Sequence, residues 1–547
     1  MADLLTGAVP TSGDGLSEAT APPGTSDPSV AGGPGAPSSP AGTDIAAGTA
    51  GAVARGGAVN MAGSIIYGMA NFGLLVVLDR TLGPKSAGIV LVAIAIFNIT
   101  STVAELGCST GLIRMISRDR AIHREDRIRA TLIVGVVPVA VAAVVLAATL
   151  FALAQPFAHL LADKDKVGVV ADVLRGMALF LSFSALHSVL VQGTRGFDTM
   201  VPQVIIERVG RALTLPLVVA VAVALGMGPI GVGIAWAATN LLALVFSAQW
   251  IYQRTRRATE GSGREPVRAD RKMARAFWAF TAPRAVGNAS EVAVSWMDTV
   301  LIGALVSTTA AGIYASGTRY LLPGIYAAEA LMQVTGPRIS GLLARGERQE
   351  ASALLKIVAG WQVAVMWPIY LLTALFARPL LSVFGHPALQ ARGALIALAV
   401  AMLVVSPAGP VASVMLMSGR SRQAMGNTLV LVAINLGGNL LFVHRYGITA
   451  AGLVWAATIL VAAALPGWQS AHSLGVPTLG RPAFMAIAVS VATVGVIGVL
   501  VRQIVGETAI GLLLASSLGA LAYLVGLRLV RSQLHLDTLW NGIRRRS

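Results

Sequence analysis

Hydrophobic runs of about 20 residues recur along almost the whole chain, and short polar segments separate them. A helix rises 1.5 Å per residue, so a run of this length crosses the roughly 30 Å apolar core of a bilayer. The pattern predicts an all-α polytopic membrane protein with about fourteen transmembrane helices. The predicted helices lie near residues 58–78, 88–106, 131–154, 173–192, 201–224, 230–251, 277–303, 311–334, 356–377, 393–417, 424–443, 450–466, 482–501 and 508–527.

The predicted seventh helix carries a polar stripe. Its polar residues are spaced four, three, four and three apart, which places them on one helical face. Three ionisable groups near a helix centre cost about 8 kcal/mol or more, and the nine large apolar residues return only about 4 to 5 kcal/mol. The stripe therefore lines a protein interior or a watery cavity, which indicates a transport path, with buried structural ion pairs as the alternative. Its members are Arg284, Asn288, Glu291, Ser295 and Asp298.

Charge placement orients the predicted helices. With the first helix starting inside, the inward loops hold 28 of the 41 Lys and Arg residues, and the outward loops hold eight. Positively charged loops stay in the cytoplasm, so we expect both termini there and the protein in the inner (plasma) membrane. The net charge of +16 does not indicate a nucleic-acid partner, because most basic residues lie in these loops with few aromatic residues.

The N-terminal segment differs from the rest of the chain. Residues 1–54 are rich in Pro, Gly, Ala, Ser and Thr, with five acids, no base and no aromatic residue. This composition is typical of a disordered tail, here cytoplasmic. The single cysteine, Cys108, excludes an intramolecular disulfide and a CxxC motif, and we expect it to be a small buried apolar residue.

Internal repetition divides the membrane region. Ala87-Gly88-Ile89 matches Ala311-Gly312-Ile313, and residues 233–239 (GIAWAAT) match residues 452–458 (GLVWAAT). Six helices separate the copies, so both halves have the same orientation, as in parallel repeats about an axis normal to the membrane. The predicted parts are a tail (1–54), a first six-helix lobe (55–252), a cytoplasmic linker (253–276), a second six-helix lobe (277–466), two extra helices (467–530) and a basic cytoplasmic tail (531–547).

Several short motifs resemble one known family. They are Arg80-x-Leu82-Gly83-Pro84 followed by Ala87-Gly88, then Glu105-Leu106-Gly107, Gly111-Leu112-x-Arg114-x-x-Ser117 and Gly193-x-Arg195-Gly196. Over about residues 56–530 the chain resembles the polysaccharide flippases of the multidrug/oligosaccharidyl-lipid/polysaccharide exporter superfamily. The resemblance implies two six-helix bundles around a central cavity, alternating access, and a polyprenyl-diphosphate carrier bearing an oligosaccharide as substrate. These motifs are mostly packing and turn residues, so they indicate the fold better than the cargo.

Three arginines are candidates for holding a diphosphate. Arg208, Arg211 and Arg284 lie at similar depth, roughly 10 to 15 Å from the cytoplasmic side. Arginine binds phosphate oxygens in pairs and keeps its charge when desolvated. Structural pairing is the alternative, because three glutamates lie in about the same layer. These are Glu105, Glu207 and Glu329.

Two further positions are candidates for coupling. Glu291 and Arg319 lie at similar depth on antiparallel helices, so we expect an ion pair that opens when a diphosphate takes the arginine. Asp298 lies further out, where it is placed to sense H⁺ or Na⁺ from the external side. The predicted substrate-binding set is Arg208, Arg211, Arg284, Asn288, Glu291 and Arg319, and the predicted coupling set is Glu291 and Asp298.

Three functional classes remain. The first is a flippase for a lipid-linked oligosaccharide in polysaccharide or lipopolysaccharide synthesis, with other assembly proteins as partners. The second is an ion-coupled multidrug or cation antiporter, which favours carboxylates and aromatics in its cavity. The third is a membrane polymerase or ligase, which needs a larger external loop than this chain offers. We find no GxxxxGK[ST], HExxH or nucleotide fingerprint, so we expect no enzyme activity, no catalytic residue, no metal site and no cofactor beyond H⁺ or Na⁺ coupling.

Overall fold

The structure is a computed structural model that describes residues 41–162, 164–261, 263–409, 421–474 and 478–534. All elements in these ranges are helical, which confirms the all-α prediction. The predicted tails lie largely outside these ranges. Helix α1 begins at Ala41, inside the predicted disordered segment, because residues 41–54 are rich in alanine, the strongest helix former.

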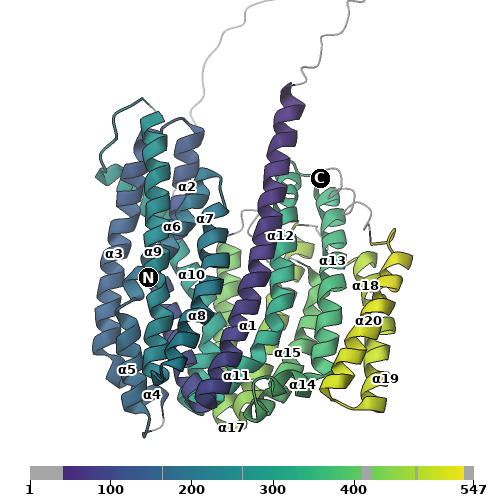
Figure 1. Cartoon of the computed structure of the whole chain (residues 1–547). Helices are drawn as coiled ribbons and strands as arrows, with labels where there is room; N and C mark the ends of the chain where they lie inside the picture. The colour runs from purple at the N-terminus through teal and green to yellow at the C-terminus, as the bar shows by residue number, and fades with distance from the viewer. Residues whose placement is uncertain (1–40, 163, 262, 410–420, 475–477, 535–547) are drawn as a thin grey trace, which may run out of the picture. The chain divides into compact units, whose positions relative to one another are not determined.

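The helices follow one another with short connections (Figure 1). The first half holds α1 (Ala41–Ala104), α2 (Cys108–Ala121), α3 (Ile128–Ala152), α4 (Ala154–Leu161), α5 (Val167–Ala178), α6 (Leu181–Gly193), α7 (Val201–Gln203), η3 (Val204–Gly210), α8 (Arg211–Ala224) and α9 (Gly228–Gly261). The second half holds α10 (Arg271–Leu305), α11 (Thr308–Thr318), η4 (Arg319–Leu321), α12 (Leu322–Ala344), α13 (Arg348–Leu375), α14 (Ala377–Ser382), α15 (Arg392–Val405), α17 (Ser421–Gln469), α18 (Arg481–Ser490), α19 (Val496–Val505) and α20 (Ala509–Leu529).

Two long helices each contain a break that separates two predicted spans. Gly83 in α1 has φ 73° and ψ 161°, and Pro84 follows it. Gly447 in α17 has φ 61° and ψ −146°. A positive φ is easily adopted only by glycine, which is why both breaks fall on this residue. Each break reverses the chain between two hydrophobic runs without a longer loop.

Eight helices in the described ranges are long and apolar enough to cross a membrane, or nine if α5 and the segment from α6 to Phe197, bent by 45°, form one span. The chain is therefore a multi-pass membrane protein. Helix α10 is not among the eight, because Arg284, Glu291 and Asp298 interrupt its apolar sequence. The predicted total of fourteen stays a prediction.

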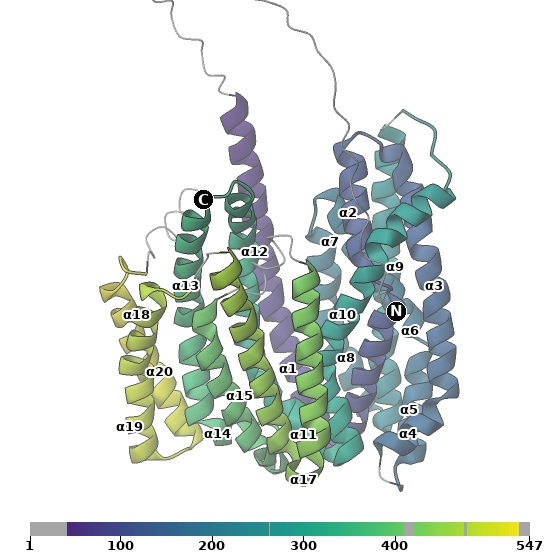
Figure 2. The ribbon, with the colours of Figure 1, turned by 180° about the vertical axis from the view of Figure 1, so that it is seen from behind.

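Helix contacts group neighbours in sequence. Helices α2, α3, α5, α6 and α9 form one set, in which α3 contacts all the others, while α13, α15 and α17 form a second set. Helices α18 and α20 lie beside α13, at the right of Figure 1 and at the left of Figure 2. Helix α10 contacts α2 and α3 of the first set as well as α17 of the second. The division into two lobes stays a prediction that these contacts do not test.

Two glycines that the repeat makes equivalent touch each other. A Cβ added at Gly312 would lie 2.8 Å from Cα of Gly88, and a Cβ added at Gly88 would lie 1.9 Å from the carbonyl oxygen of Thr308. The backbones of α1 and α11 are thus in direct contact. Nearby, the Ser316 hydroxyl donates a hydrogen bond to Asp79, and Arg80 donates to the carbonyl oxygen of Val383 at 2.9 Å. These contacts join helices from the two predicted lobes.

The predicted linker is partly helical and is fixed to a neighbouring loop. Helix α9 continues to Gly261, and the Asp270 carboxylate caps α10 by accepting from the backbone N–H of Met273. Between them, the N–H of Val267 donates to the carbonyl oxygen of Asp126 at 3.1 Å. Hydrogen bonds from Arg124 hold the pKa of the Asp126 carboxyl below its usual range. The linker therefore follows a defined path past the loop after α2.

Candidate functional site

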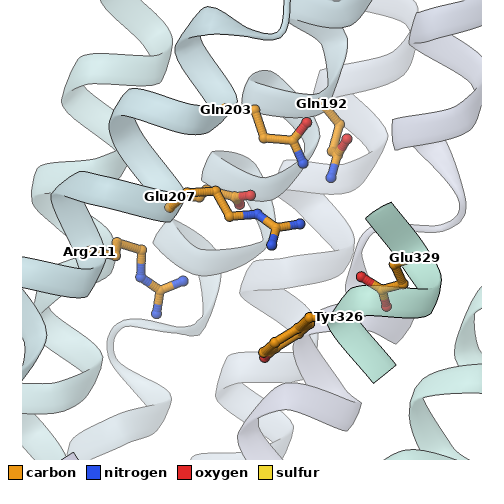
Figure 3. Close-up of a pocket in the computed structure, with 7 residues that line it drawn as sticks. Gln192, Gln203, Glu207, Arg211, Tyr326 and Glu329 are labelled. Carbon is orange, nitrogen blue, oxygen red and sulfur yellow. The ribbon is translucent and has the colours of Figure 1, made fainter. Parts of the chain in front are cut away.

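The structure contains a cavity of about 320 Å³ between helices of the two predicted lobes (Figure 3). Arg211 and Glu329 reach toward it from opposite sides. The first half of the chain supplies its side chains from α6, α7, η3 and α8, and the second half supplies them from α12. The lining residues are Gln192, Gln203, Glu207, Arg208, Arg211, Tyr326 and Glu329.

A π-helix positions the charged residues of this cavity. Element η3 follows the wider i→i+5 turn from Val204 to Gly210, and such turns often mark functional sites. A Cβ at Gly210 would lie 2.8 Å from the carbonyl oxygen of Ile205, so this turn accommodates glycine there. Glu207 and Arg211 are four residues apart and so lie on the same side of this helical segment, where both line the cavity.

The charges in the cavity are balanced. Glu207 lies within electrostatic range of both Arg208 and Arg211. Glu329, on the opposite side, is in range of Arg208 and of Glu291. The cavity thus holds two arginines and two glutamates. It contains both the arginines that phosphate capture needs and the glutamates that structural pairing needs. The Nε of Arg211 is buried and has no hydrogen-bond partner among the described residues.

Arg284 does not join this cavity. Its guanidinium lies 5.9 Å from the ring centre of Phe280, and the Arg114 guanidinium lies 4.0 Å from the same ring. Both arginines are exposed. The predicted three-arginine layer is therefore divided, with Arg208 and Arg211 in the cavity and Arg284 beside Phe280 on α10. The equal depth of the three residues did not reveal that they point in different directions.

Asp298 lies in a buried polar network instead of on an open face. Its carboxylate accepts hydrogen bonds from the Tyr314 hydroxyl at 3.0 Å and from the Asn439 side-chain amide at 2.8 Å. Asn439 also donates to the backbone and side-chain oxygens of Asn435, at 2.8 and 3.2 Å. All four residues are at most 3% exposed. The sequence prediction missed both asparagines, although their spacing of four on one predicted helix is a signal that could have found them.

The other predicted residues are more accessible. Glu291 and Ser295 are exposed, and Asn288 is half-buried. Arg319 lies over the ring of Trp296, with its guanidinium 5.6 Å from the ring centre. Among the described residues, the structure gives no ion pair between Glu291 and Arg319, so it does not bring these two side chains together. Cys108 is fully buried, as expected, and the described residues contain no group of three His, Cys, Asp or Glu that would hold a metal ion.

Comparison with protein families gave one match. The family model described as polysaccharide biosynthesis protein matches residues 53–343, which is more than half of the chain. Comparison with curated proteins gave no match.

Solved structures share the fold at low sequence identity. The lipid II flippase MurJ in an inward closed conformation has a TM-score of 0.66 and 12% identity, over 86% of this chain and 98% of that one. A multidrug resistance MATE family transporter of the MOP superfamily, in an inward-facing conformation, has a TM-score of 0.59 and 15% identity, over 75% and 94%. A MOP superfamily transporter from Pyrococcus furiosus has a TM-score of 0.53 and 14% identity, over 78% and 95%.

Proposed function

We propose that this chain, which belongs to the polysaccharide biosynthesis protein family, is a flippase that moves a polyprenyl-diphosphate-linked oligosaccharide from the cytoplasmic to the outer leaflet. The observation that carries the proposal is the cavity lined by Arg208, Arg211 and side-chain amides. It receives residues from both halves of a fold shared with a lipid II flippase. The glycan serves polysaccharide synthesis or export, and the partners are other polysaccharide-assembly proteins in the inner membrane.

The chemistry of the cavity fits the head of such a substrate. Arginine forks match pairs of phosphate oxygens, and the charge-assisted hydrogen bonds are about twice as strong as neutral ones. Gln192 and Gln203 offer donors and acceptors for sugar hydroxyls, and Tyr326 offers a ring for a sugar face. A volume of about 320 Å³ is at the small end of ligand pockets, so it holds the diphosphate and the adjoining sugar while the rest of the glycan and the lipid tail lie outside.

Helix α10 is positioned to connect binding with movement. Its contacts extend to α2 and α3 of the first set and to α17 of the second, so a change in the angle between these sets must bend or shift it. Asp298 on α10 and the asparagines on α17 belong to the same buried network. We assign H⁺ or Na⁺ coupling to this network, because binding a cation at Asp298 favours one arrangement of α10 against α17.

An ion-coupled antiporter for cationic compounds is the second candidate. Glu207 and Glu329 give the cavity two carboxylates, and Tyr326 adds an aromatic ring, which together suit an organic cation. The fold is also shared with a multidrug transporter. The two candidates differ in which pair of charges contacts the ligand. They therefore predict opposite ligand preferences.

Ligand-induced stabilisation of the purified full chain distinguishes them. We expect polyprenyl diphosphate to raise the Tm and to bind more tightly than polyprenyl monophosphate. Arg211→Gln should weaken diphosphate binding about 10- to 100-fold, because losing charge-assisted hydrogen bonds costs about 1.5 to 3 kcal/mol. The matched control is Arg256→Gln, which removes an exposed guanidinium from the ion pair with Glu260 and should leave binding unchanged. Stabilisation by tetraphenylphosphonium but not by polyprenyl diphosphate would support the antiporter.

A further inference from the structure

A buried histidine lies directly behind the cavity. His187 of α6 is 1% exposed. Its Nδ1 lies 2.9 Å from the Ser247 hydroxyl on α9, and its Nε2 lies 3.4 Å from a carboxylate oxygen of Glu207. Glu207 in turn lines the cavity. A chain of polar groups thus runs from the helix interface through the histidine to the proposed anion site.

The hydrogen-bond pattern suits one tautomer of His187. With the Ser247 hydrogen directed to the carbonyl oxygen of Ala243, one turn earlier, the Ser247 oxygen accepts from Nδ1 of the histidine. In a neutral ring, Nε2 then carries a lone pair. This lone pair faces the Glu207 oxygen at 3.4 Å, so a proton gained by Nε2 would complete a hydrogen bond to the carboxylate.

From this geometry we infer that His187 and Glu207 form a proton-binding site whose occupancy is linked to anion binding in the cavity. The pair holds one proton between Nε2 and the carboxylate when the anion is bound and gives it up to water when the anion leaves. The inference rests on the proposed function, because it needs an anion held by Arg208 and Arg211. The inference adds a proton site in the first predicted lobe, and this site is distinct from the Asp298 network.

The surrounding charges explain the linkage. Helix α6 packs against α2, α3 and α9, and the charged groups facing the pair are Glu105 and three arginines. With the cavity empty, the arginines oppose a further positive charge on the pair. A diphosphate neutralises that field, so the pair binds its proton more tightly. By reciprocity, protonation of the pair strengthens anion binding by the same factor. The three arginines are Arg195, Arg208 and Arg211.

Proton uptake on binding inorganic pyrophosphate tests the inference. The purified full chain in weakly buffered detergent solution is titrated with pyrophosphate between pH 6.5 and 8.5, with binding and proton uptake measured on the same sample. We expect wild type to take up as much as about one proton more per bound pyrophosphate than His187→Asn, because the pair has one proton to gain. The comparison removes the protonation of pyrophosphate itself. Asparagine retains a side-chain amide that can donate to Ser247, which favours folding of the variant.

The possible outcomes distinguish failure of this inference from failure of the proposed flippase function. Absence of pyrophosphate binding to wild type would overturn both proposals. Binding with equal proton uptake in wild type and His187→Asn would overturn this inference alone. Glu207→Gln is the second variant, in case the first does not fold, and it should also lose the extra uptake. Asp298→Asn should retain the extra proton uptake. If the extra uptake is lost in Asp298→Asn and in neither of the other variants, the proton binds in the Asp298 network and the assignment to His187 is wrong.

Discussion

Asp298→Ala should abolish transport and lower the Tm, whereas Asp298→Asn should fold like wild type and still fail to transport. Removing the carboxylate leaves the Tyr314 hydroxyl without its acceptor in a buried site, and Asn439 keeps only its hydrogen bonds to Asn435. A buried donor left unsatisfied costs about 1 to 3 kcal/mol, so we expect the alanine variant to lose about that much stability. Asparagine keeps the shape and one acceptor but carries no charge to hold H⁺ or Na⁺.

Thermal unfolding and transport measured on the same preparations check this expectation. Ser295→Ala is the matched control on α10, because that exposed hydroxyl donates only to the backbone carbonyl of Glu291. It should change neither quantity. Transport by Asp298→Asn at the wild-type rate would show that the network only supports the structure.

Gly88→Ala disrupts the contact between α1 and α11 and lowers the Tm strongly. The added Cβ would lie 1.9 Å from the Thr308 carbonyl oxygen, so a backbone segment must move. Overpacking of this kind costs about 1 to 3 kcal/mol and sometimes more. Gly312 also lies close to Gly88, so α1 and α11 must move apart to accommodate the added methyl group.

Gly73→Ala in the same helix is the control for helix propensity. A Cβ at Gly73 has nothing within 4 Å, so alanine should be neutral or stabilise α1 by up to about 1 kcal/mol. The difference in Tm between the two variants measures the cost of the close contact. Equal Tm values would mean that the α1–α11 contact is looser than the structure indicates.

Hydropathy predicted most of the helices because most of the segments that cross the membrane are apolar along their length. The fourteen predicted runs fall on helices wherever the structure describes them. The pair Gly88 and Gly312 shows that the repeat carried spatial information as well, since equivalent positions proved to be in contact. Helix breaks at Gly83 and Gly447 also followed from local chemistry, because glycine is the residue that adopts their backbone angles.

The candidate site was predicted only in part. Residue spacing shows which side chains share a face of one helix, and residue number gives approximate depth, but neither shows which faces of different helices meet. Arg284 therefore lies outside the cavity beside Phe280, while Gln192 and Tyr326 were missed. The π-helix at η3 is a second reason, because its wider turn rotates the residues that follow it relative to a regular α-helix, which residue spacing takes for granted.

Transbilayer movement in proteoliposomes tests the central claim most directly. A fluorescent polyprenyl-diphosphate oligosaccharide is placed in one leaflet, and its appearance in the other is followed with a membrane-impermeant quencher. The account predicts movement by the wild-type protein and at least about tenfold slower movement by the double variant Arg208→Gln, Arg211→Gln, which loses both phosphate-binding forks. Absence of movement by wild type, or equal rates in wild type and the double variant, would contradict it.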